Sequence, residues 1–463
     1  MFRKVEIWFL YLIILMGLPI TVGFGALVRH ELVNEGYGLR SINLGWISKN
    51  ALFFAEIPTN FKQIFREAQA KELQVIGDRF PNLNNFDGIP NNKESYLLLS
   101  KFDGDLKEGV VELIDLTNFE LLHTWNPDIN KFNSLVDKID EFEYLDRDHN
   151  NSRSKLIHPK LLNDGGLVFA QGTPLRKIDE CSNLIFQNTH DQFHHSIETD
   201  IEGNLWVPSH MFPQTLSSEK IGRDTLAKGG YNDDAIVKLS PDGIVLFEKS
   251  VSQIFIDNEL EYLLFSVGDR IFDKDPIHLN DIQPVDFDGK YWKKGDIFLS
   301  LRHQSMVFLY RPSTNKIIWK GTGPFFHQHD VNILDKNRIS IFNNNSKVFF
   351  DDKEIVEGHN EVIIYDFETD KYSTYLSESL VKNDVRTNTS GRSQILPNGD
   401  LFVEESNFGR SLYFNSDGSL RWTHLNRADN KNVYSVGWSR ILFTKNDIVA
   451  VERFMRSRGK CDS

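Results

Sequence analysis

The amino-acid sequence predicts an all-β fold, a six-bladed β-propeller, preceded by an N-terminal transmembrane helix. About six copies of one strand-turn unit recur between Ser95 and Glu452, and repeats of four short strands at this period are typical of propeller blades. An uncharged apolar run from Ile7 to Val28 supplies the helix. The predicted domains are an anchor over 1–30, a juxtamembrane segment with a helix over 31–94, the propeller over 95–455 and a tail over 456–463.

The apolar run is long enough, at about 1.5 Å per residue, to cross a hydrocarbon core. Arg3 and Lys4 precede it and Arg29 follows it. Gly23-Phe24-Gly25 makes a poor cleavage site, which favours a retained single-pass anchor over a cleaved signal. With the first two cations on the cytoplasmic side, we expect the rest of the chain to be exported.

The segment that follows the run contains one helical pattern. Pro58-Thr59-Asn60 is a helix start signal, and apolar residues then recur at helical spacing at Phe61, Ile64, Phe65 and Ala68. A juxtamembrane helix over 60–73 is therefore predicted, with no function assigned to it.

The β pattern begins near Ser95. The stretch SYLLLSKFDGDLKEGVVELIDLTNFELLHTW reads as three strands joined by turns, and similar stretches are GDIFLSLRHQSMVFLYRPSTNKIIWKG and GDLFVEESNFGRSLYFNSDGSLRWTH. Seven or eight blades, or a sandwich, would use the same strands, so the architecture is better determined than the count. The glycine turns fit hairpins, and no glycine-rich phosphate motif follows a strand, which argues against nucleotide binding.

Composition restricts the partners of the chain. The 463 residues are 40% hydrophobic and 12% aromatic, enough for a large core. The formal net charge of -13 argues against nucleic acid as a partner, because phosphate binding needs a cationic face. The two cysteines, Cys181 and Cys461, could form one long-range disulfide or remain free thiols, and their spacing does not decide.

Polar residues stand where apolar strands begin or end. A lone histidine or arginine at a strand end is more often a structural residue. Here, however, such residues recur at intervals of no more than about one blade length, as expected if each successive repeat directs a side chain to a common point. They are His194, His195, His278, Asn280, Arg302 and His329. Imidazole can act as nucleophile or base and an arginine fork can hold an oxyanion, so the set suits transfer of a tetrahedral oxyanion group.

Metal binding is the alternative for several histidines in one channel, namely His194, His195, His278, His327 and His329. No carboxylate or thiolate recurs at ligand spacing, and Arg302 would oppose a cation. We therefore predict neither a metal nor a cofactor. His303, His327 and His359 are interpreted as surface or loop residues.

The motifs that contain the candidate site residues resemble those of a known protein family. The sequence is similar to the bacterial arylsulfate sulfotransferase (arylsulfotransferase) family of six-bladed propellers in HLND, in GDIFLSLRHQSMVFLYRPSTNKIIWKGTG, in HQHDVNILDKNRISIFNNN and in SGRSQILPNGDLFVEESNFGRSLYFNSDGSLRW. The similarity covers roughly Ile157 to Trp422.

The resemblance implies ping-pong transfer of a sulfuryl group from a phenolic sulfate ester to a phenol, without metal or nucleotide donor. His329 would be transiently sulfated, His278 and Arg302 would bind sulfate and the transition state, and His195 would be the upstream catalytic histidine. Asn280, His194, Thr389 and Arg392 would contact substrate, with Thr387 near them, and Asp330 is a candidate to orient an imidazole. Ser196 stands where the family has Asp after the histidine pair.

The resemblance also implies a bacterial source, so the exported side would be the periplasm. The expected partners are a small aryl sulfate donor, a phenol acceptor and, through the helix, the membrane. A homodimer is among the oligomeric states that the sequence leaves open. The alternatives to an enzyme are an exported propeller that binds a sulfated or other anionic ligand without turnover, and an interaction platform with only core histidines.

Overall fold

The computed structural model describes residues 7–32, 46–48, 50–57, 74–137, 139–217, 231–265, 274–348, 354–457 and 461. The chain forms two compact units, Met1–Leu73 and Gln74–Ser463. The helix predicted over 60–73 lies outside the described residues.

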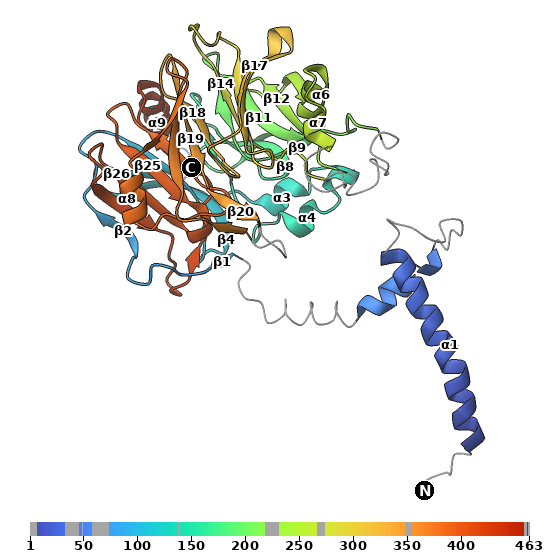
Figure 1. The fold of residues 1–463 in the computed structure, drawn as a ribbon. Coiled ribbons are helices and arrows are strands. Elements are labelled where there is room, and N and C mark those ends of the chain that lie inside the picture. Colours follow the sequence, from blue (N-terminus) through green and yellow to red (C-terminus); the bar gives the residue numbers. More distant parts are fainter. Residues whose placement is uncertain are drawn as a thin grey trace. The chain divides into compact units, whose positions relative to one another are not determined.

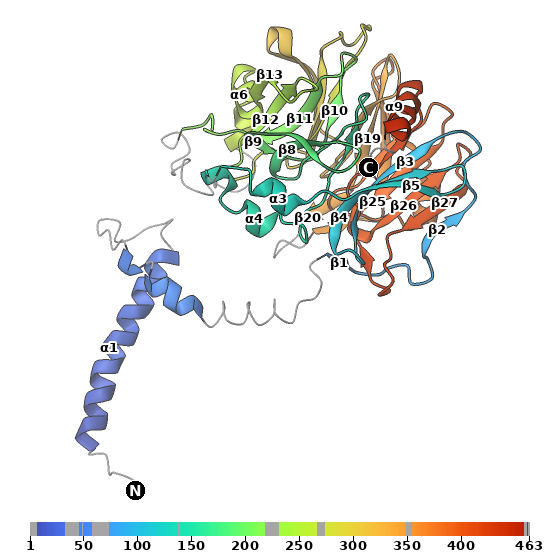
Figure 2. The same ribbon diagram turned by 180° about the vertical axis from the view of Figure 1, so that it is seen from behind.

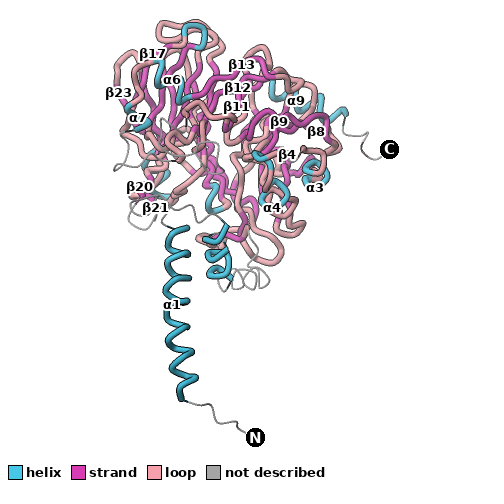
Figure 3. The backbone as a smooth tube through the Cα atoms, turned by 90° about the vertical axis from the view of Figure 1, so that its right-hand side faces the viewer, coloured by secondary structure: helices cyan, strands magenta, loops and turns pink. Residues whose placement is uncertain are grey.

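The first unit contains helix α1, Ile7–Leu32, with Pro19 inside it. Its stretch from Ile7 to Arg29 is long and apolar enough to cross a membrane, and none of that stretch is buried within the protein. Large apolar side chains such as Leu15 are exposed along it, and Figure 3 shows it as one continuous helix. One helix therefore meets the length and composition expected of the predicted anchor.

The second unit is mainly β and propeller-like, as Figure 1 shows. Four of its sheets have four or five antiparallel strands and form blades. In pairing order they are β29 (Arg440–Leu442), β3 (Tyr96–Asp103), β4 (Glu108–Asp115) and β5 (Glu120–Trp125); β14 (Leu279–Pro284), β15 (Ile297–Leu301), β16 (Met306–Arg311) and β17 (Lys316–Gly321); β18 (Val331–Ile333), β19 (Arg338–Asn343), β22 (Glu361–Asp366) and β23 (Lys371–Tyr375); β2 (Asn85–Gly88), β27 (Leu420–Leu425), β26 (Arg410–Phe414), β25 (Leu401–Glu405) and β24 (Arg392–Ile395).

A further sheet has eight strands. Its order is β13 (Val245–Ser250), β12 (Asp234–Leu239), β11 (Leu205–His210), β9 (Leu184–Phe193), β8 (Thr173–Ile178), β7 (Leu167–Phe169) and β6 (Lys160–Leu161), and β10 (Glu198–Thr199) pairs with β11. Two small sheets pair β1 (Val75–Ile76) with β28 (Val433–Tyr434) and β20 (Ser346–Val348) with β21 (Glu354–Val356).

The helices of this unit are short and lie outside the strands (Figure 3). They are α3 (Ile129–Asn133), α4 (Leu145–Asp148), α6 (Val251–Asp257), α7 (Tyr262–Phe265), α8 (Ser377–Lys382) and α9 (Lys445–Ser457), with 3₁₀ turns over Asp140–Phe142, Pro312–Thr314 and Ser406–Phe408.

The core lies between neighbouring sheets. One apolar cluster joins Phe298 of β15 and Val307 of β16 to Ile339 and Ile341 of β19, all fully buried. The register of β15 and β16 is regular from Ile297 opposite Tyr310 to Leu301 opposite Met306. Both faces of such a strand are covered, which explains its unbroken apolar run in the sequence.

Strands from the two ends of this unit pair with each other. Figure 2 shows β2 and β3 among the C-terminal strands, because β29 pairs with β3 and β27 pairs with β2. In these pairs Arg440 lies opposite Leu98, and Trp422 opposite Gly88. Closure of this kind leaves fewer exposed sheet edges and holds the ring together.

A disulfide joins Cys181 to Cys461 across 280 residues of sequence, with Cα atoms 5.3 Å apart. The sequence left this pairing open. The bond fastens the tail of the chain, beyond α9, to the turn that precedes β9.

Candidate active site

Most of the polar residues singled out in the sequence lie in turns that lead into strands at the ends of the sheets. His195 precedes β10, His278 precedes β14, and His327 and His329 precede β18. The backbone of His195, His278 and His327 is left-handed, with φ of 57°, 56° and 49°. The same left-handed turn before successive strands places their side chains at equivalent positions. The sequence predicted that successive repeats would direct side chains to a common point.

His329 is held by its neighbours on both sides. Its N–H donates to the Phe342 carbonyl at 3.0 Å, and its own carbonyl accepts the Ser300 hydroxyl at 2.7 Å. The side chain is fully enclosed, and its ring packs edge-on against Trp438 with centroids 5.7 Å apart. The imidazole therefore has little freedom to turn.

The hydrogen bonds around His329 determine which ring nitrogen carries the proton. Asn344 donates through Nδ2 to the carbonyls of Thr387, at 3.0 Å, and Ser390, at 2.7 Å. Its Oδ1 is therefore the atom that faces His329 Nδ1 at 2.6 Å, and an amide oxygen can only accept. The proton lies on Nδ1, and Nε2 keeps its lone pair, which accepts the Ser390 N–H at 3.1 Å.

His329 is neutral at ordinary pH. Burial lowers the pKa of the imidazole well below its usual value, and the nearby charge of Arg302 lowers it further. A neutral imidazole with an unprotonated ring nitrogen is the form that can act as a nucleophile.

Arg302 joins the site through its backbone and its guanidinium. Its N–H donates to the His278 carbonyl at 2.9 Å, Nη1 donates to His303 Nε2 at 2.8 Å, and Nη2 pairs with Glu354. Among the described residues, its buried Nε has no hydrogen-bond partner. One N–H of this cation therefore remains available to an oxyanion.

A carboxylate backs His278. Nδ1 of His278 lies 2.6 Å from Asp275 Oδ2, which leaves Nε2 free of that bond. Burial alone would raise the pKa of Asp275, but the hydrogen bond and charge of His278, with the charges of His303 and His210, lower it below its usual value. The His278 ring lies 4.5 Å from that of His303, between centroids.

His195 links this group to a second one. Its ring lies 5.2 Å from that of His278 and 5.8 Å from that of Trp438, between centroids. Its Nδ1 faces His194 Nδ1 at 2.7 Å, so one of the two nitrogens donates and the other accepts. Burial, followed by the charges of the neighbouring histidines, lowers the pKa of His195 well below its usual value.

His194 belongs to a group that the sequence did not indicate. Its Nε2 lies 3.3 Å from Asp234 Oδ1, and His210 Nε2 lies 3.7 Å from the same atom. Burial is the main cause that lowers the pKa of His194 to about 3 and of His210 to about 4, and that raises the pKa of Asp234 to about 6. No carboxylate recurs at ligand spacing in the sequence, and it is the pairing of β11 with β12 that brings Asp234 beside these histidines.

Two predicted substrate contacts have positions that fit a supporting role. Asn280 is fully buried and donates to the Gln328 carbonyl at 3.0 Å, which positions the segment that carries His329. Thr389 accepts from Asn407 Nδ2 at 2.8 Å and lies next to Ser390, whose N–H reaches His329.

Arg392 and Asp330 form a buried ion pair with each other. Arg392 lies 3.4 Å from Asp330 and donates to His158 at 2.7 Å. Asp330 also accepts the Ser393 N–H at 3.1 Å. Asp330 is therefore occupied by Arg392, and Asn344 orients His329 in its place.

His303 and His327 lie in turns, as the sequence indicated, but their contacts with the site were not predicted. His303 contacts Arg302, and His327 lies 3.3 Å from Glu354. Burial opposes ionisation of Glu354, but the hydrogen bond from His327 and the charge of Arg302 lower its pKa to about 2. The only sequence signal for these two histidines was their position beside the predicted residues, in RHQ and HQHD.

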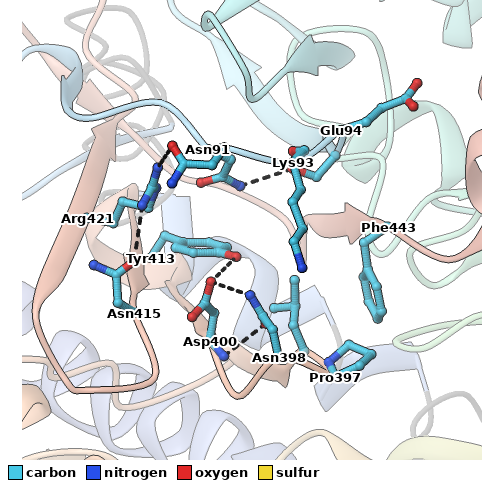
Figure 4. A pocket seen from close by; sticks show the side chains of 13 residues that line it. Asn91, Lys93, Glu94, Pro397, Asn398, Asp400, Tyr413, Asn415, Arg421 and Phe443 are labelled. Atoms are coloured by element: carbon cyan, nitrogen blue, oxygen red, sulfur yellow. Dashed lines mark hydrogen bonds between the residues drawn. The ribbon is translucent and has the colours of Figure 1, made fainter.

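Two cavities lie away from the histidines. One, of about 650 Å³, is lined by charged residues that include Lys160, Glu198, Arg392 and Arg440. The other, of about 400 Å³, is lined by residues that include Lys93, Asp400, Tyr413 and Arg421, and its side chains are drawn in Figure 4. Neither includes His195, His278, Arg302 or His329 among its lining residues.

Comparison with solved structures finds only distant likenesses. A protein of unknown function from Bacteroides caccae has 10% identity and a TM-score of 0.42, over 72% of this chain and 94% of the other. The Neurospora crassa Pan2 WD40 domain has 9% identity and 0.40, over 76% and 88%. The Doa1 WD40 β-propeller domain has 10% and 0.37, over 82% and 96%. TM-scores this low do not support a fold assignment. The propeller assignment is based on the sheet topology.

No curated protein matches the chain. A sequence model described as arylsulfotransferase (ASST) matches residues 158–427, more than half of the chain. This range contains His195, His278, Arg302 and His329, and the match supports aryl sulfotransferase activity in general. The chain belongs to the arylsulfotransferase family.

Proposed function

We propose that this protein transfers a sulfuryl group from a phenolic sulfate ester to a phenolic acceptor through a transient sulfohistidine at His329. The observation that carries the proposal is the hydrogen bond from His329 Nδ1 to Asn344, whose amide is oriented by two carbonyls. That bond leaves the lone pair on Nε2 of a buried, neutral imidazole.

In the first half of the reaction, Nε2 of His329 forms a bond to sulfur as the bond from sulfur to the aryl oxygen breaks. The phenolate leaves with the electron pair and takes a proton from His195, which enters this half as the imidazolium, the form that the bound anionic ester favours, and leaves it neutral. In the second half, the acceptor phenol returns a proton to His195, its oxygen bonds to sulfur, and the N–S bond breaks. Nδ1 keeps its proton throughout, and Asn344 Oδ1 stabilises the charge on the sulfated ring.

Fixed donors hold the sulfuryl oxygens. Arg302 offers the buried N–H that has no partner in the described part of the chain. His278 acts here as an imidazolium, which donates Nδ1–H to Asp275 and Nε2–H to the sulfuryl group. Charge on these oxygens grows or shifts as sulfur passes between nitrogen and oxygen, and donors already in place stabilise it without reorganisation. A nucleotide donor is not needed, since the leaving group is the phenol itself.

The blade count proposed is six. The eight-stranded sheet consists of two successive four-stranded meanders, β6 to β9 and β10 to β13, which join where β9 pairs with β11. A left-handed residue also lies one to four positions before the strands that begin the pairing order of six units, β6, β10, β14, β18, β24 and β29; these residues are His158, His195, His278, His327, Ser390 and Trp438. Repetition of one turn six times favours six blades over four.

We place the propeller on the exported, periplasmic side of a membrane that α1 spans. The helix has the length and composition for this, and the disulfide between Cys181 and Cys461 fits an oxidising compartment. This placement of the propeller relative to the membrane is part of the proposal.

The test uses the full-length chain in detergent with 4-nitrophenyl sulfate, with and without a phenol acceptor, beside His329→Ala. Phenol release should need the acceptor beyond one turnover and should fall at least about 10³-fold in the variant, because the nucleophile is gone. Sulfate label from a ³⁵S donor should remain on the wild-type chain only. His190→Ala, at an exposed histidine outside the site, is the matched control.

Equal inactivity of the folded wild type and His329→Ala would contradict the proposal. A binding function without turnover would then gain, and sulfate affinity would be the next measurement. Turnover that persists in His329→Ala without label on the protein would exclude the covalent route.

A further inference from the structure

The group formed by His194, His210 and Asp234 lies beside the proposed active site but has no part in the proposed reaction. His210 ends β11 and Asp234 begins β12, and the two residues are direct partners across this antiparallel pair. His194 follows β9 and donates its N–H to the Pro208 carbonyl of β11 at 3.0 Å. Three adjacent strands therefore direct their side chains to one point.

The polar atoms at this point lack partners. Within the described residues, His194 Nε2 and both carboxylate oxygens of Asp234 are buried without a hydrogen bond. The Leu279 N–H approaches the carboxylate and favours its ionised form, but it does not meet either oxygen with hydrogen-bond geometry. Three unsatisfied atoms at one point are costly, since each buried polar group without a partner destabilises a fold.

The distances fit a shared cation. His194 Nε2 and His210 Nε2 lie 3.3 Å and 3.7 Å from Asp234 Oδ1, and all three candidate ligand atoms lie within 4.8 Å of one another. Two ligands at about 2.0–2.1 Å from a tetrahedral zinc ion are roughly 3.3–3.4 Å apart. Imidazole nitrogens with a carboxylate oxygen are also a donor set that zinc accepts.

We propose that His194 Nε2, His210 Nε2 and the Asp234 carboxylate bind a divalent cation of the zinc class. The ion would satisfy the three unpaired atoms at once, and its fourth position would be open to water. The site goes beyond the proposed sulfuryl transfer, in which no metal takes part.

Two other groups of histidines and carboxylates provide a contrast. In one, Asp275 bonds to His278 at 2.6 Å and His303 bonds to the Asp275 carbonyl at 2.6 Å. In the other, His190 bonds to Glu248 at 3.0 Å and Asp191 accepts the Ser209 hydroxyl at 2.5 Å. Each carboxylate in these two groups has at least one oxygen in a hydrogen bond, whereas among the described residues neither oxygen of Asp234 is in one.

The cation would also place a proton in the active site. With Nε2 of His194 bound to metal, the proton of that ring lies on Nδ1, which then donates to His195 Nδ1 across 2.7 Å. His195 in turn carries its proton on Nε2. The metal would thus set the tautomer of both rings while the enzyme is at rest.

The experiment measures metal in the full-length chain, purified in detergent with a tag that contains no histidine. The chain is stripped with a chelator, incubated with Zn²⁺, freed of excess ion and analysed by elemental mass spectrometry. About one zinc per chain should remain in the wild type and in His190→Asn, a matched control in the exposed group. His210→Asn and Asp234→Asn should each lose at least about ten-fold in zinc affinity.

A second measurement does not depend on how the variants fold. Co²⁺ added to the stripped wild-type chain should give the intense visible absorption of a four-coordinate site, and Zn²⁺ should abolish it by displacement. Zinc that stays in His210→Asn and Asp234→Asn, or a wild type that binds neither ion, would overturn the proposal. Because metal content is measured without substrate, an inactive enzyme leaves the result intact.

Discussion

The pocket of Figure 4 and the histidine cluster around His329 both gather polar side chains, but they use them differently. In the pocket, Asp400 accepts the Tyr413 hydroxyl at 2.9 Å and Asn398 Nδ2 at 2.7 Å, and Arg421 bonds to Asn92 at 2.8 Å. Most of the polar groups drawn there satisfy one another. The pocket is open to a ligand in shape, yet it offers little reactive chemistry.

The histidine cluster lies outside the linings of both cavities described above, and it contains buried polar atoms that have few or no partners. His329 presents a lone pair that meets only a backbone N–H, and in the described chain Arg302 Nε and Asn280 Oδ1 are buried without partners. Buried groups that remain unsatisfied are costly to a fold, so their concentration indicates function. Cavity volume and chemical capacity are therefore separate properties in this molecule.

Among substitutions that distinguish the two regions, we expect the largest change in kcat at Asn344, in the histidine cluster. Asn344→Leu removes the acceptor at His329 Nδ1, so the proton can move to Nε2 and block the lone pair. We expect kcat to fall on the order of 10²-fold, comparable to loss of an oriented catalytic base. Steady-state kinetics with an aryl sulfate and a phenol check this.

Asn344→Asp keeps an acceptor at the same place and serves as the conservative comparison. It should retain more activity than Asn344→Leu, and ¹⁵N chemical shifts of His329 should report Nδ1–H in the wild type and Asp variants only. Equal losses in the two variants, with the tautomer unchanged, would mean that Asn344 acts only through folding.

A smaller effect is expected from pH. Burial and Arg302 lower the pKa of His329, so the nucleophile stays neutral as pH falls from 8 to 5.5, whereas an imidazole of ordinary pKa would lose about ten-fold of its neutral form. The burst of phenol release should change by less than about two-fold over this range. A fall with an apparent pKa near 6.5 would contradict the buried, neutral His329.

Folding must be followed in the same experiment. The unfolded chain binds a proton at His329 below about pH 6.5 and the folded chain does not, so stability is present above that pH and is lost as pH falls toward the lowered folded pKa. For one such histidine the loss is about 1.4 kcal/mol at pH 5.5. Circular dichroism at each pH separates unfolding from protonation of the nucleophile.

The smallest effect is expected in the pocket. Lys93 lies over it in Figure 4, and Lys93→Ala removes its cation from the lining. We expect kcat/KM and Tm to change little, with kcat/KM within about two-fold, because surface substitutions away from special features are nearly neutral. A ten-fold rise in KM for the sulfate ester would instead place the donor in this pocket.

Much of the fold follows from local pattern. The strands β3, β4 and β5 lie within SYLLLSKFDGDLKEGVVELIDLTNFELLHTW, as predicted. The pairing of β29 with β3 and of β2 with β27 did not follow, because strands about 340 residues apart carry no local signal of each other. The disulfide could not be predicted for the same reason, because Cys181 and Cys461 are 280 residues apart in the sequence.

The site residues also fall into two groups, those with a local signal in the sequence and those without one. Its turn histidines and Arg302 stand out locally, since polar residues interrupt apolar strands at a repeating interval. Asn344 lies in an ordinary run of three asparagines, and Glu354 and Asp275 lie in unremarkable polar stretches. Each acquires its role from a partner that the chain brings from elsewhere, as when Asn344 meets the carbonyls of Thr387 and Ser390.

By itself, the sequence determined the β architecture and the apolar N-terminal helix, and it indicated the histidines and Arg302 at the strand ends as candidates. Alternation of apolar and polar side chains and repetition of turns are local properties, and they suffice for these conclusions. Only the tertiary structure decided which nitrogen of His329 keeps its lone pair, which carboxylates stand beside the histidines, and that Cys181 meets Cys461. These depend on contacts within a few ångströms between residues that are 3 to 280 positions apart, and sheet packing sets such distances.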